Sequence, residues 1–277
     1  MTAVPHTARP APPVDPALLS RALETAGRLA NDAAEVITAT LGRERGGTLD
    51  ARAKANPFDW VTDTDRTLER HTRRVLAAEF PGYPVVGEEY GWGEGPAHPT
   101  AAGMRWVVDP VDGTANYVAG LPWCAYSLAL VDPDGPAVGV VADPGRGQIY
   151  AAARGRGFRA NGVPVPGRRA CRVAGSLICA EDPDAGFAAR CRAAHAGVRV
   201  LGSSALAITQ VALGHAVAAV LEGCHEWDVA GALCLAAESG AVVLDRDGRA
   251  AALPEGGMLV AAPDVASEMY ALWRGSV

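Results

Sequence analysis

The chain has 277 residues, 49% of them hydrophobic, which is enough for one large domain or two smaller domains that share a cleft. Its net charge of −6 at pH 7 argues against a general nucleic-acid-binding surface, and no run of about 18 apolar residues predicts a membrane span. The six cysteines lack metal-binding spacing, so they are predicted to be free thiols in a reducing, cytoplasmic compartment.

The N-terminal region divides into a tail and a helix. Residues 1–14 are rich in Pro, Ala and Thr and lack the regions of a signal peptide, so they are predicted to be a disordered tail. Asp15-Pro16 opens a long amphipathic pattern that Gly42 ends, which predicts a helix. Its apolar face indicates core packing and carries no residues of chemical interest.

A segment rich in carboxylates and hydroxyls, residues 54–65, precedes a second predicted helix. It begins with Lys54, the only lysine in the chain, and contains Asp59, Asp63 and Asp65. Helix capping or the helix dipole explains one such Asp, but explains three together less well. A structural role at the start of the helix and a role in a functional site both stay open at this point.

A short apolar strand at Val85-Val86 runs through Gly87 into two acids, Glu88 and Glu89. Taken alone, such a pair is best interpreted as two surface side chains.

The most informative stretch begins with the apolar run Trp106–Val108, which predicts the end of a buried strand. Asp109 ends that run and Asp112 comes three residues later, then Gly113 and Thr114. Two carboxylates on one tight turn repel each other unless a cation lies between them, and hard oxygen ligands suit Mg²⁺. Gly113 lets backbone N–H groups approach an anion closely.

The same stretch is compatible with an ordinary Asp-Pro, Asp-Gly turn, which accounts for the residues without any ligand. Spacing argues against two kinds of known site. A calcium-binding loop needs acidic or amide side chains where Val111 and Gly113 stand. The haloacid dehalogenase-type phosphatases place their two Asp residues two apart, whereas here they are three apart.

The pattern of predicted secondary structure changes near residue 173. Strands are predicted at 122–131 and in a hairpin over 137–153, whereas strands and helices alternate from 173 onward. We therefore expect an N-terminal α+β domain over 15–172 that carries most metal ligands, and a C-terminal α/β domain over 173–277. Asp228 opens the penultimate predicted helix, where an N-cap is the simpler role for it.

Four separated segments together resemble the inositol monophosphatase family, and the resemblance covers roughly residues 15–270. The family's motifs D-P-[IVL]-D-G-T-x-N-[FY], K-x(4)-D-x-V-T-x-x-D, G-E-E and W-D-x-A-[AG] match this chain at 109–117, 54–65, 87–89 and 227–231. The resemblance implies a layered α-β-α-β-α sandwich of the inositol monophosphatase/fructose-1,6-bisphosphatase type. It also implies a homodimer and a lithium-sensitive, Mg²⁺-dependent phosphomonoesterase activity on a small phosphorylated metabolite.

The resemblance also assigns roles. Two or three Mg²⁺ would be held by Glu88, Asp109, Asp112, Asp228 and the Val111 carbonyl. Asp65 and Thr114 would pair to orient the attacking water and accept its proton. The phosphate would lie on the backbone at Gly113, Thr114 and Ala115. Lys54, Asp59 and Glu89 would support the metal ligands.

The chain departs from the family pattern at the substrate. Inositol-cleaving members carry a Glu six residues before the Trp of the W-D motif, where this chain has Leu221 and, one residue later, Glu222. The expected substrate is therefore a small polyol or sugar phosphate that resembles inositol phosphate, with inositol 1-phosphate itself not the best substrate and Glu222 as a candidate contact. Histidinol-phosphate and 3′-phosphoadenosine 5′-phosphate-type nucleotides are the alternatives, and a regulatory or binding protein on the same fold is the alternative of another class.

Overall fold

A computed structural model describes residues 14–43, 52–53, 60–93, 103–166 and 171–275. Residues 1–13 of the predicted tail, Lys54 and Asp59 lie outside the described residues, whereas Val14 is partly buried against the core. The helices are α1 (Pro16–Thr40), α2 (Asp63–Glu79), α3 (Thr114–Ala119), α4 (Ala185–Ala193), α5 (Ser204–Ala212), α6 (Glu226–Glu238) and α7 (Ala266–Arg274), with short 3-10 turns η2 (Pro144–Arg146) and η3 (Pro263–Val265).

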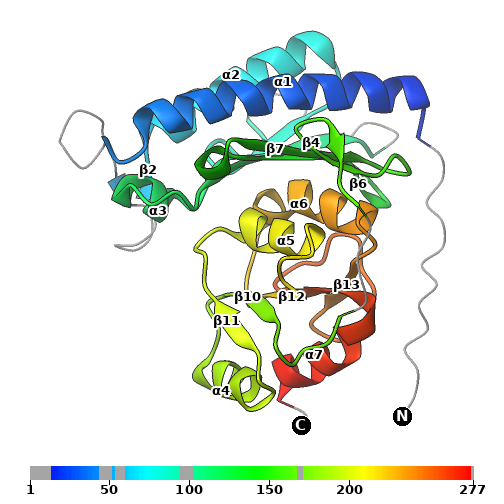
Figure 1. The fold of residues 1–277 in the computed structure, drawn as a ribbon. Helices are drawn as coiled ribbons and strands as arrows, with labels where there is room; N and C mark the ends of the chain where they lie inside the picture. Colours follow the sequence, from blue (N-terminus) through cyan, green and yellow to red (C-terminus); the bar gives the residue numbers. More distant parts are fainter. Residues whose placement is uncertain (1–13, 44–51, 54–59, 94–102, 167–170, 276–277) are drawn as a thin grey trace.

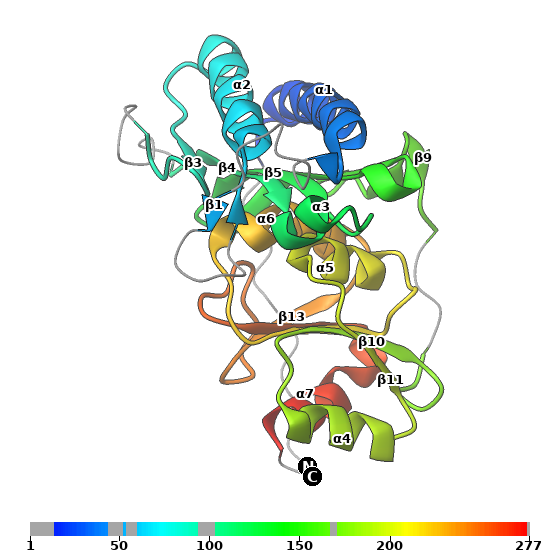
Figure 2. The ribbon, with the colours of Figure 1, turned by 90° about the vertical axis from the view of Figure 1, so that its left-hand side faces the viewer.

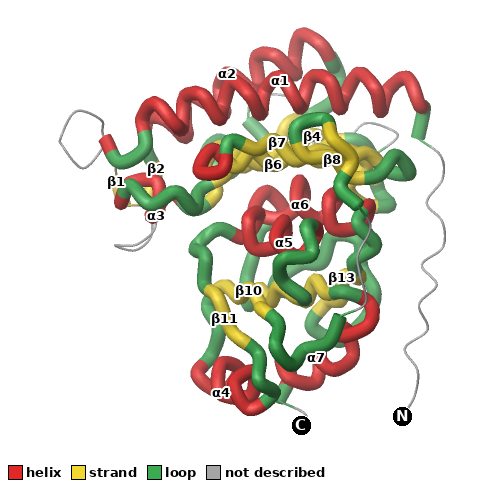
Figure 3. The backbone as a smooth tube through the Cα atoms, viewed as in Figure 1, coloured by secondary structure: helices red, strands yellow, loops and turns green. Residues whose placement is uncertain are grey.

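The elements stack in five layers (Figure 1). Helices α1 and α2 cover one face of a seven-stranded sheet, and α5 and α6 lie between that sheet and a five-stranded one. Helices α4 and α7 cover the far face of the second sheet, as the secondary-structure colouring of Figure 3 shows. The predicted α-β-α-β-α sandwich is confirmed.

The first sheet is built mainly from consecutive antiparallel strands, and only its first pair is parallel. Its central strands are apolar along most of their length and buried on both faces, because helices cover both sides. In spatial order the strands are β3 (Val85–Gly87), β4 (Arg105–Asp112), β5 (Ala125–Asp132), β6 (Gly135–Asp143), β7 (Gln148–Ala153), β8 (Phe158–Ala160) and β9 (Val163–Pro164).

Strand β4 runs further than the sequence predicted. It was expected to end where Asp109 comes after Val108, but it continues to Asp112 with a shift of register against β5 between Asp109 and Asp112. Pro110 lacks a backbone N–H, and a bulge is where a sheet tolerates proline. The irregular stretch therefore keeps both acids within the sheet and sets them on a distorted backbone.

The second sheet is mixed. Strand β10 runs parallel to its neighbours β11 and β12, and β14 is antiparallel to β12 and β13. In spatial order its strands are β11 (Gly197–Arg199), β10 (Leu177–Glu181), β12 (Ala218–Leu221), β14 (Met258–Ala261) and β13 (Val242–Asp245). A separate pair, β1 (Arg52–Ala53) and β2 (Trp60–Val61), lies before α2.

Figure 2 shows α5 and α6 between the two sheets. The core that is packed there takes residues from both halves of the chain. Helix α6 packs on β4, β5 and β6, and α5 packs on β10 and β12. The approach of α6 is close, because a Cβ at Gly231 would lie 2.5 Å from Ser127 Oγ and one at Gly139 would lie 2.2 Å from the Gly231 carbonyl oxygen. The division into two domains at residue 172 stays a prediction.

Candidate active site

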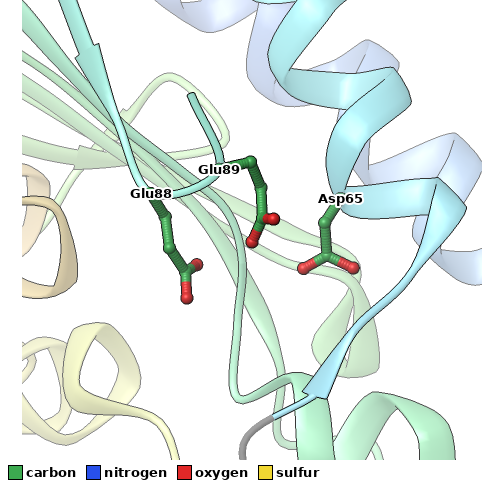
Figure 4. A group of neighbouring side chains, drawn as sticks. All are labelled: Asp65, Glu88 and Glu89. Carbon is green, nitrogen blue, oxygen red and sulfur yellow. The ribbon is translucent and has the colours of Figure 1, made fainter. Parts of the chain in front are cut away.

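Acidic side chains from four elements converge where the first sheet meets α6. They come from the N-terminus of α2, the end of β3, the irregular end of β4 and the first turn of α6. One carboxylate oxygen from each of Asp65, Glu88 and Glu89 lies within 4.8 Å of the other two (Figure 4). Glu89, expected only as a supporting residue, is thus among the acids that lie together.

Asp65 both takes part in capping α2 and reaches across to Thr114. Its Oδ2 accepts hydrogen bonds from the Thr62 hydroxyl and, at 3.0 Å, from the Thr62 backbone N–H. Its Oδ1 lies 3.3 Å from Thr114 Oγ1, which is also 2.9 Å from the Val111 carbonyl oxygen. The structure therefore brings the predicted Asp65 and Thr114 into contact although 49 residues separate them.

The two acids of β4 are oriented by backbone and hydroxyl donors. Asp109 is 2% exposed, and its Oδ1 accepts the Val111 backbone N–H at 3.0 Å. Asp112 accepts the Ser203 hydroxyl and the backbone N–H groups of Ser204 at 3.2 Å and Ala205 at 2.8 Å. Asp112 therefore lies on the N-terminus of α5, which favours its negative charge.

Burial and mutual repulsion act on these carboxylates together. Burial, and then the charges of Glu88, Asp112 and Asp228, raise the pKa of Asp109 well above its usual range. Burial likewise raises the pKa of Asp112 to about 8 and that of Asp65 to about 7. Part of each pKa shift comes from the negative charge of a neighbouring acid, so the acids from separate elements lie close to one another.

The donor set consists of oxygen ligands that carry negative charge. In the part of the chain that the structure describes, no Arg or Lys forms an ion pair with Asp65, Asp109 or Asp112. Several buried carboxylates without a cationic partner are costly, and a hard divalent cation removes that cost. Carboxylate and carbonyl oxygens are the ligands that Mg²⁺ prefers. The residues therefore fit a Mg²⁺ site.

Asp228 is not the N-cap of α6. The helix begins at Glu226 with His225 as its N-cap, and Asp228 occupies the third helical position. Its Oδ2 accepts the His225 backbone N–H at 2.6 Å, which makes it the acid of a capping box. The simple N-cap interpretation was wrong by three residues. The same carboxylate still lies close enough to raise the pKa values of Asp109 and Asp112.

One supporting residue, Glu69, was not predicted from the sequence. It is fully buried, and it accepts the backbone N–H groups of Glu89 at 2.8 Å and Tyr90 at 3.3 Å. Arg73, four residues later, pairs with it at 2.7 Å. A Cβ at Gly87 would lie 2.2 Å from Glu69 Oε1, so a larger residue there would displace the Glu69 carboxylate. The spacing of Glu69 and Arg73 in the sequence is typical of an ion pair along a helix. That spacing does not indicate that Glu69 binds the turn that carries Glu88.

The two residues that depart from the family pattern, Leu221 and Glu222, are engaged by other parts of the protein. Leu221 is fully buried in the core between the sheets. The Glu222 carboxylate accepts the Trp273 indole N–H at 2.6 Å and lies 3.2 Å from the Arg246 guanidinium. Both partners belong to the C-terminal part of the chain.

Comparison with known proteins identifies the family. Residues 18–274 match the inositol monophosphatase family. The chain belongs to this family. Its members are phosphomonoesterases, so the expectation of a phosphoric monoester hydrolase is confirmed. Within the described ranges, no helix combines the length and the apolar character needed to cross a membrane.

Relatives in this family have different substrates in their names. Inositol-1-monophosphatase SuhB of Mycobacterium tuberculosis is 37% identical over 251 residues, covering 83% of this chain and 84% of its own. Histidinol-phosphatase of the same organism is 41% identical over 139 residues, half of each chain. Among solved structures, the Thermotoga maritima IMPase TM1415 has a TM-score of 0.81 at 24% identity, covering 92% of this chain and 97% of its own. An IMPase/NADP phosphatase complexed with Mg²⁺ and phosphate has a TM-score of 0.80 at 21% identity, covering 92% and 95%.

The first prediction concerns the cost of the buried acids without metal. A carboxyl whose pKa is raised in the folded state loses stability as the pH rises above its unfolded value of about 3.9. Asp109→Asn should therefore stabilise the metal-free protein, by more than about 1 kcal/mol at pH 8 and by less at pH 5. Thermal unfolding in chelator at both pH values measures this. Glu255→Gln, at an exposed acid, is the matched control and should show no such trend. Equal or lower stability of Asp109→Asn at both pH values would contradict the account.

Proposed function

We propose that this protein is a Mg²⁺-dependent phosphomonoesterase that uses water to hydrolyse the phosphate ester of a small polyol or sugar. The observation that carries the proposal is the contact of Asp65 with Thr114 beside the cluster of Glu88, Asp109 and their neighbours. A base paired with a hydroxyl, next to ligands for a hard cation, is the equipment for metal-assisted hydrolysis.

The metal ligands that we propose are Glu88, Asp109, Asp112, Asp228 and the carbonyl oxygen of Val111. Two or three Mg²⁺ would be shared among them. When bound, Mg²⁺ supplies charge for the phosphate oxygens and lowers the pKa of a bound water.

The side chains of Asp65 and Thr114 would handle the proton of the attacking water. The Thr114 hydroxyl donates its single hydrogen to Asp65 or to the Val111 carbonyl, so its oxygen can accept a hydrogen bond from that water. Asp65, with a pKa of about 7, can take up a proton near neutral pH. Its hydrogen bonds to Thr62 fix the carboxylate in place for that role.

The phosphate would be bound by backbone N–H groups at Gly113, Thr114 and Ala115. Gly113 has a φ of 83°, a left-handed conformation that favours glycine. A Cβ there would also lie 2.7 Å from the Gly202 carbonyl oxygen and 2.8 Å from that of Trp123. The turn is therefore closed to larger residues, which supports an arrangement built for close approach to a ligand.

The body of the substrate would meet a site without a carboxylate on β12. Leu221 is buried and Glu222 binds Trp273 and Arg246, so neither offers an acceptor to a sugar hydroxyl. This supports a substrate other than inositol 1-phosphate, with histidinol-phosphate and nucleotide phosphates as the alternatives. The name of the M. tuberculosis histidinol-phosphatase shows that the family includes such an enzyme.

We also propose a homodimer in the cytoplasm. Four exposed apolar side chains support the dimer. Trp123 (47% exposed) and Leu177 (40%) line one cavity of about 430 Å³, Leu121 (42%) is two residues before Trp123, and Val200 (59%) stands between Arg199 and Leu201, which line the same cavity. Exposed apolar patches of this kind mark sites of protein association. All six cysteines are free, which supports a reducing compartment.

The second prediction tests the function directly. Phosphate release should be measured on inositol 1-phosphate, sugar phosphates, histidinol-phosphate and 3′-phosphoadenosine 5′-phosphate, with Mg²⁺ and after exhaustive chelation. We expect release only with Mg²⁺, inhibition by Li⁺, and a higher kcat/KM for some other ester than for inositol 1-phosphate. Full activity after chelation rejects the metal, and inositol 1-phosphate as clearly the best substrate rejects the argument from Leu221.

The third prediction concerns the water. Thr114→Ala should lower kcat by about 100-fold or more, because the oriented acid–base pair is lost. Mg²⁺ binding, measured by calorimetry, should persist since no metal-ligand side chain is removed. Thr38→Ala, at an exposed threonine of α1, is the control and should leave kcat unchanged. A folded Thr114→Ala protein with near-normal kcat would reject the role.

The fourth prediction separates structure from substrate contact at Glu222. Glu222→Ala should change kcat and KM less than about threefold, because the carboxylate is engaged by Trp273 and Arg246. It should lower the thermal midpoint, since Trp273 Nε1 and Arg246 lose their acceptor and an unpaired buried donor costs about 1–3 kcal/mol. A rise in KM with an unchanged midpoint would show that Glu222 contacts the substrate.

A further inference from the structure

Glu181 is an acid of the second sheet that none of the proposed roles uses. It is the last residue of β10 and pairs in parallel register with Leu221 of β12. Registered neighbours project from the same face of a sheet, and Leu221 lies in the core between the sheets. Glu181 is therefore on the face of the second sheet that is turned toward α5 and the first sheet.

The carboxylate of Glu181 holds the turn between β11 and α5. Its Oε1 accepts the backbone N–H of Leu201 at 3.3 Å, and its Oε2 accepts that of Gly202 at 3.1 Å. In the described part of the chain, no Arg, Lys or His forms an ion pair with Glu181. A partly buried carboxylate is costly when amides alone compensate it, so its two bonds to successive amides need a structural or functional reason.

The same turn is held from the other side by the first half of the chain. The Asn116 side-chain amide donates to the carbonyl oxygens of Leu201 at 2.8 Å and Gly202 at 3.3 Å. The Gly202 carbonyl oxygen also faces Gly113, where a Cβ would lie 2.7 Å from it. Glu181 on the N–H side and Asn116 on the carbonyl side thus fix the orientation of these peptides.

The turn leads directly into the N-terminus of α5, which binds Asp112. Ser203 is the N-cap of α5, and its hydroxyl donates to Asp112. The next two backbone N–H groups, of Ser204 and Ala205, also donate to Asp112. Any rotation of the Leu201–Gly202 peptides would carry Ser203 with them and release Asp112.

We infer that Glu181 is a positioning residue that, through the turn at Leu201–Ser203, holds Asp112 in the orientation required for divalent-cation binding. The inference rests on the proposed function for the role of Asp112. A glutamine at 181 would offer one acceptor oxygen, and its NH₂ group would face the second backbone N–H. The amide variant therefore cannot hold both peptides.

The test is calorimetric titration of the full-length protein with Mn²⁺ and with Mg²⁺. Outer partners of a metal ligand typically change metal affinity by about 10–100-fold, so Glu181→Gln should raise the dissociation constant at least about tenfold. At saturating Mg²⁺, kcat should return to within about threefold of wild type and KM for the ester should change little. The matched control is Glu222→Gln, the same change at an acid that directly follows β12 and binds Trp273, and it should leave the metal constant unchanged.

Three results would overturn the inference. One is an unchanged metal constant in folded Glu181→Gln. Another is an equal loss in Glu222→Gln. The third is a raised KM with an unchanged metal constant, which would make Glu181 a substrate contact. If Glu181→Gln does not fold, Glu181→Asp is the second variant. It keeps both acceptor oxygens but, being one methylene shorter, holds them farther from the backbone N–H groups of Leu201 and Gly202. An unchanged metal constant in that variant overturns the inference as well.

A double-mutant cycle tests the route through Ser203. Ser203→Ala removes the hydroxyl that Asp112 accepts, so the effects of Glu181→Gln and Ser203→Ala on metal binding should be less than additive. Additive effects would contradict the route. Because metal binding is measured without turnover, a wild type that binds metal but releases no phosphate from any ester would reject the proposed function and leave this inference standing.

Discussion

The position of Asp112 on the N-terminus of α5 is the interaction on which the site depends. Asp112 belongs to β4 in the first sheet, whereas its donors Ser203, Ser204 and Ala205 begin a helix of the layer between the sheets. The acid is therefore oriented only when both layers are in place. A site that needs two layers to assemble is also one that couples ligand binding to the stability of the whole sandwich.

Three other acids of the site also accept hydrogen bonds from backbone N–H groups. Asp65 accepts the amide of Thr62, Asp109 that of Val111, and Asp228 that of His225. An amide fixes a carboxylate but leaves its full charge, and burial together with the neighbouring charges then raises the pKa of Asp109. The buried carboxylates therefore repel one another in the absence of metal, and a divalent cation would remove that repulsion. Such a site lowers the stability of the metal-free protein for the sake of function.

The sequence predicted the parts that local chemistry determines. Asp15-Pro16 at the start of α1 and the hairpin of β6 and β7 around η2 were both expected from capping and turn rules. The four motifs, in their order along the chain, were enough to predict the layered fold. Each cap, turn or motif is a short continuous segment of the sequence.

The features that the sequence could not reveal depend on contacts between distant residues. The bond from Ser203 to Asp112 spans 91 residues, and that from Trp273 to Glu222 spans 51. Glu69 and Glu181 were missed for the same reason, since each binds the backbone of a turn 20 or more residues away. The extension of β4 past Pro110 was missed because a bulge defeats the rule that proline ends a central strand.

The most direct test of the account is a crystal structure of the protein with Mn²⁺ and inorganic phosphate, with the ions located by anomalous scattering. The account predicts at least one anomalous peak among the carboxylates of Glu88, Asp109, Asp112 and Asp228, with phosphate beside it at the turn of Gly113. Ordered carboxylates at these positions with no peak between them, at a Mn²⁺ concentration that supports phosphate release, would contradict it.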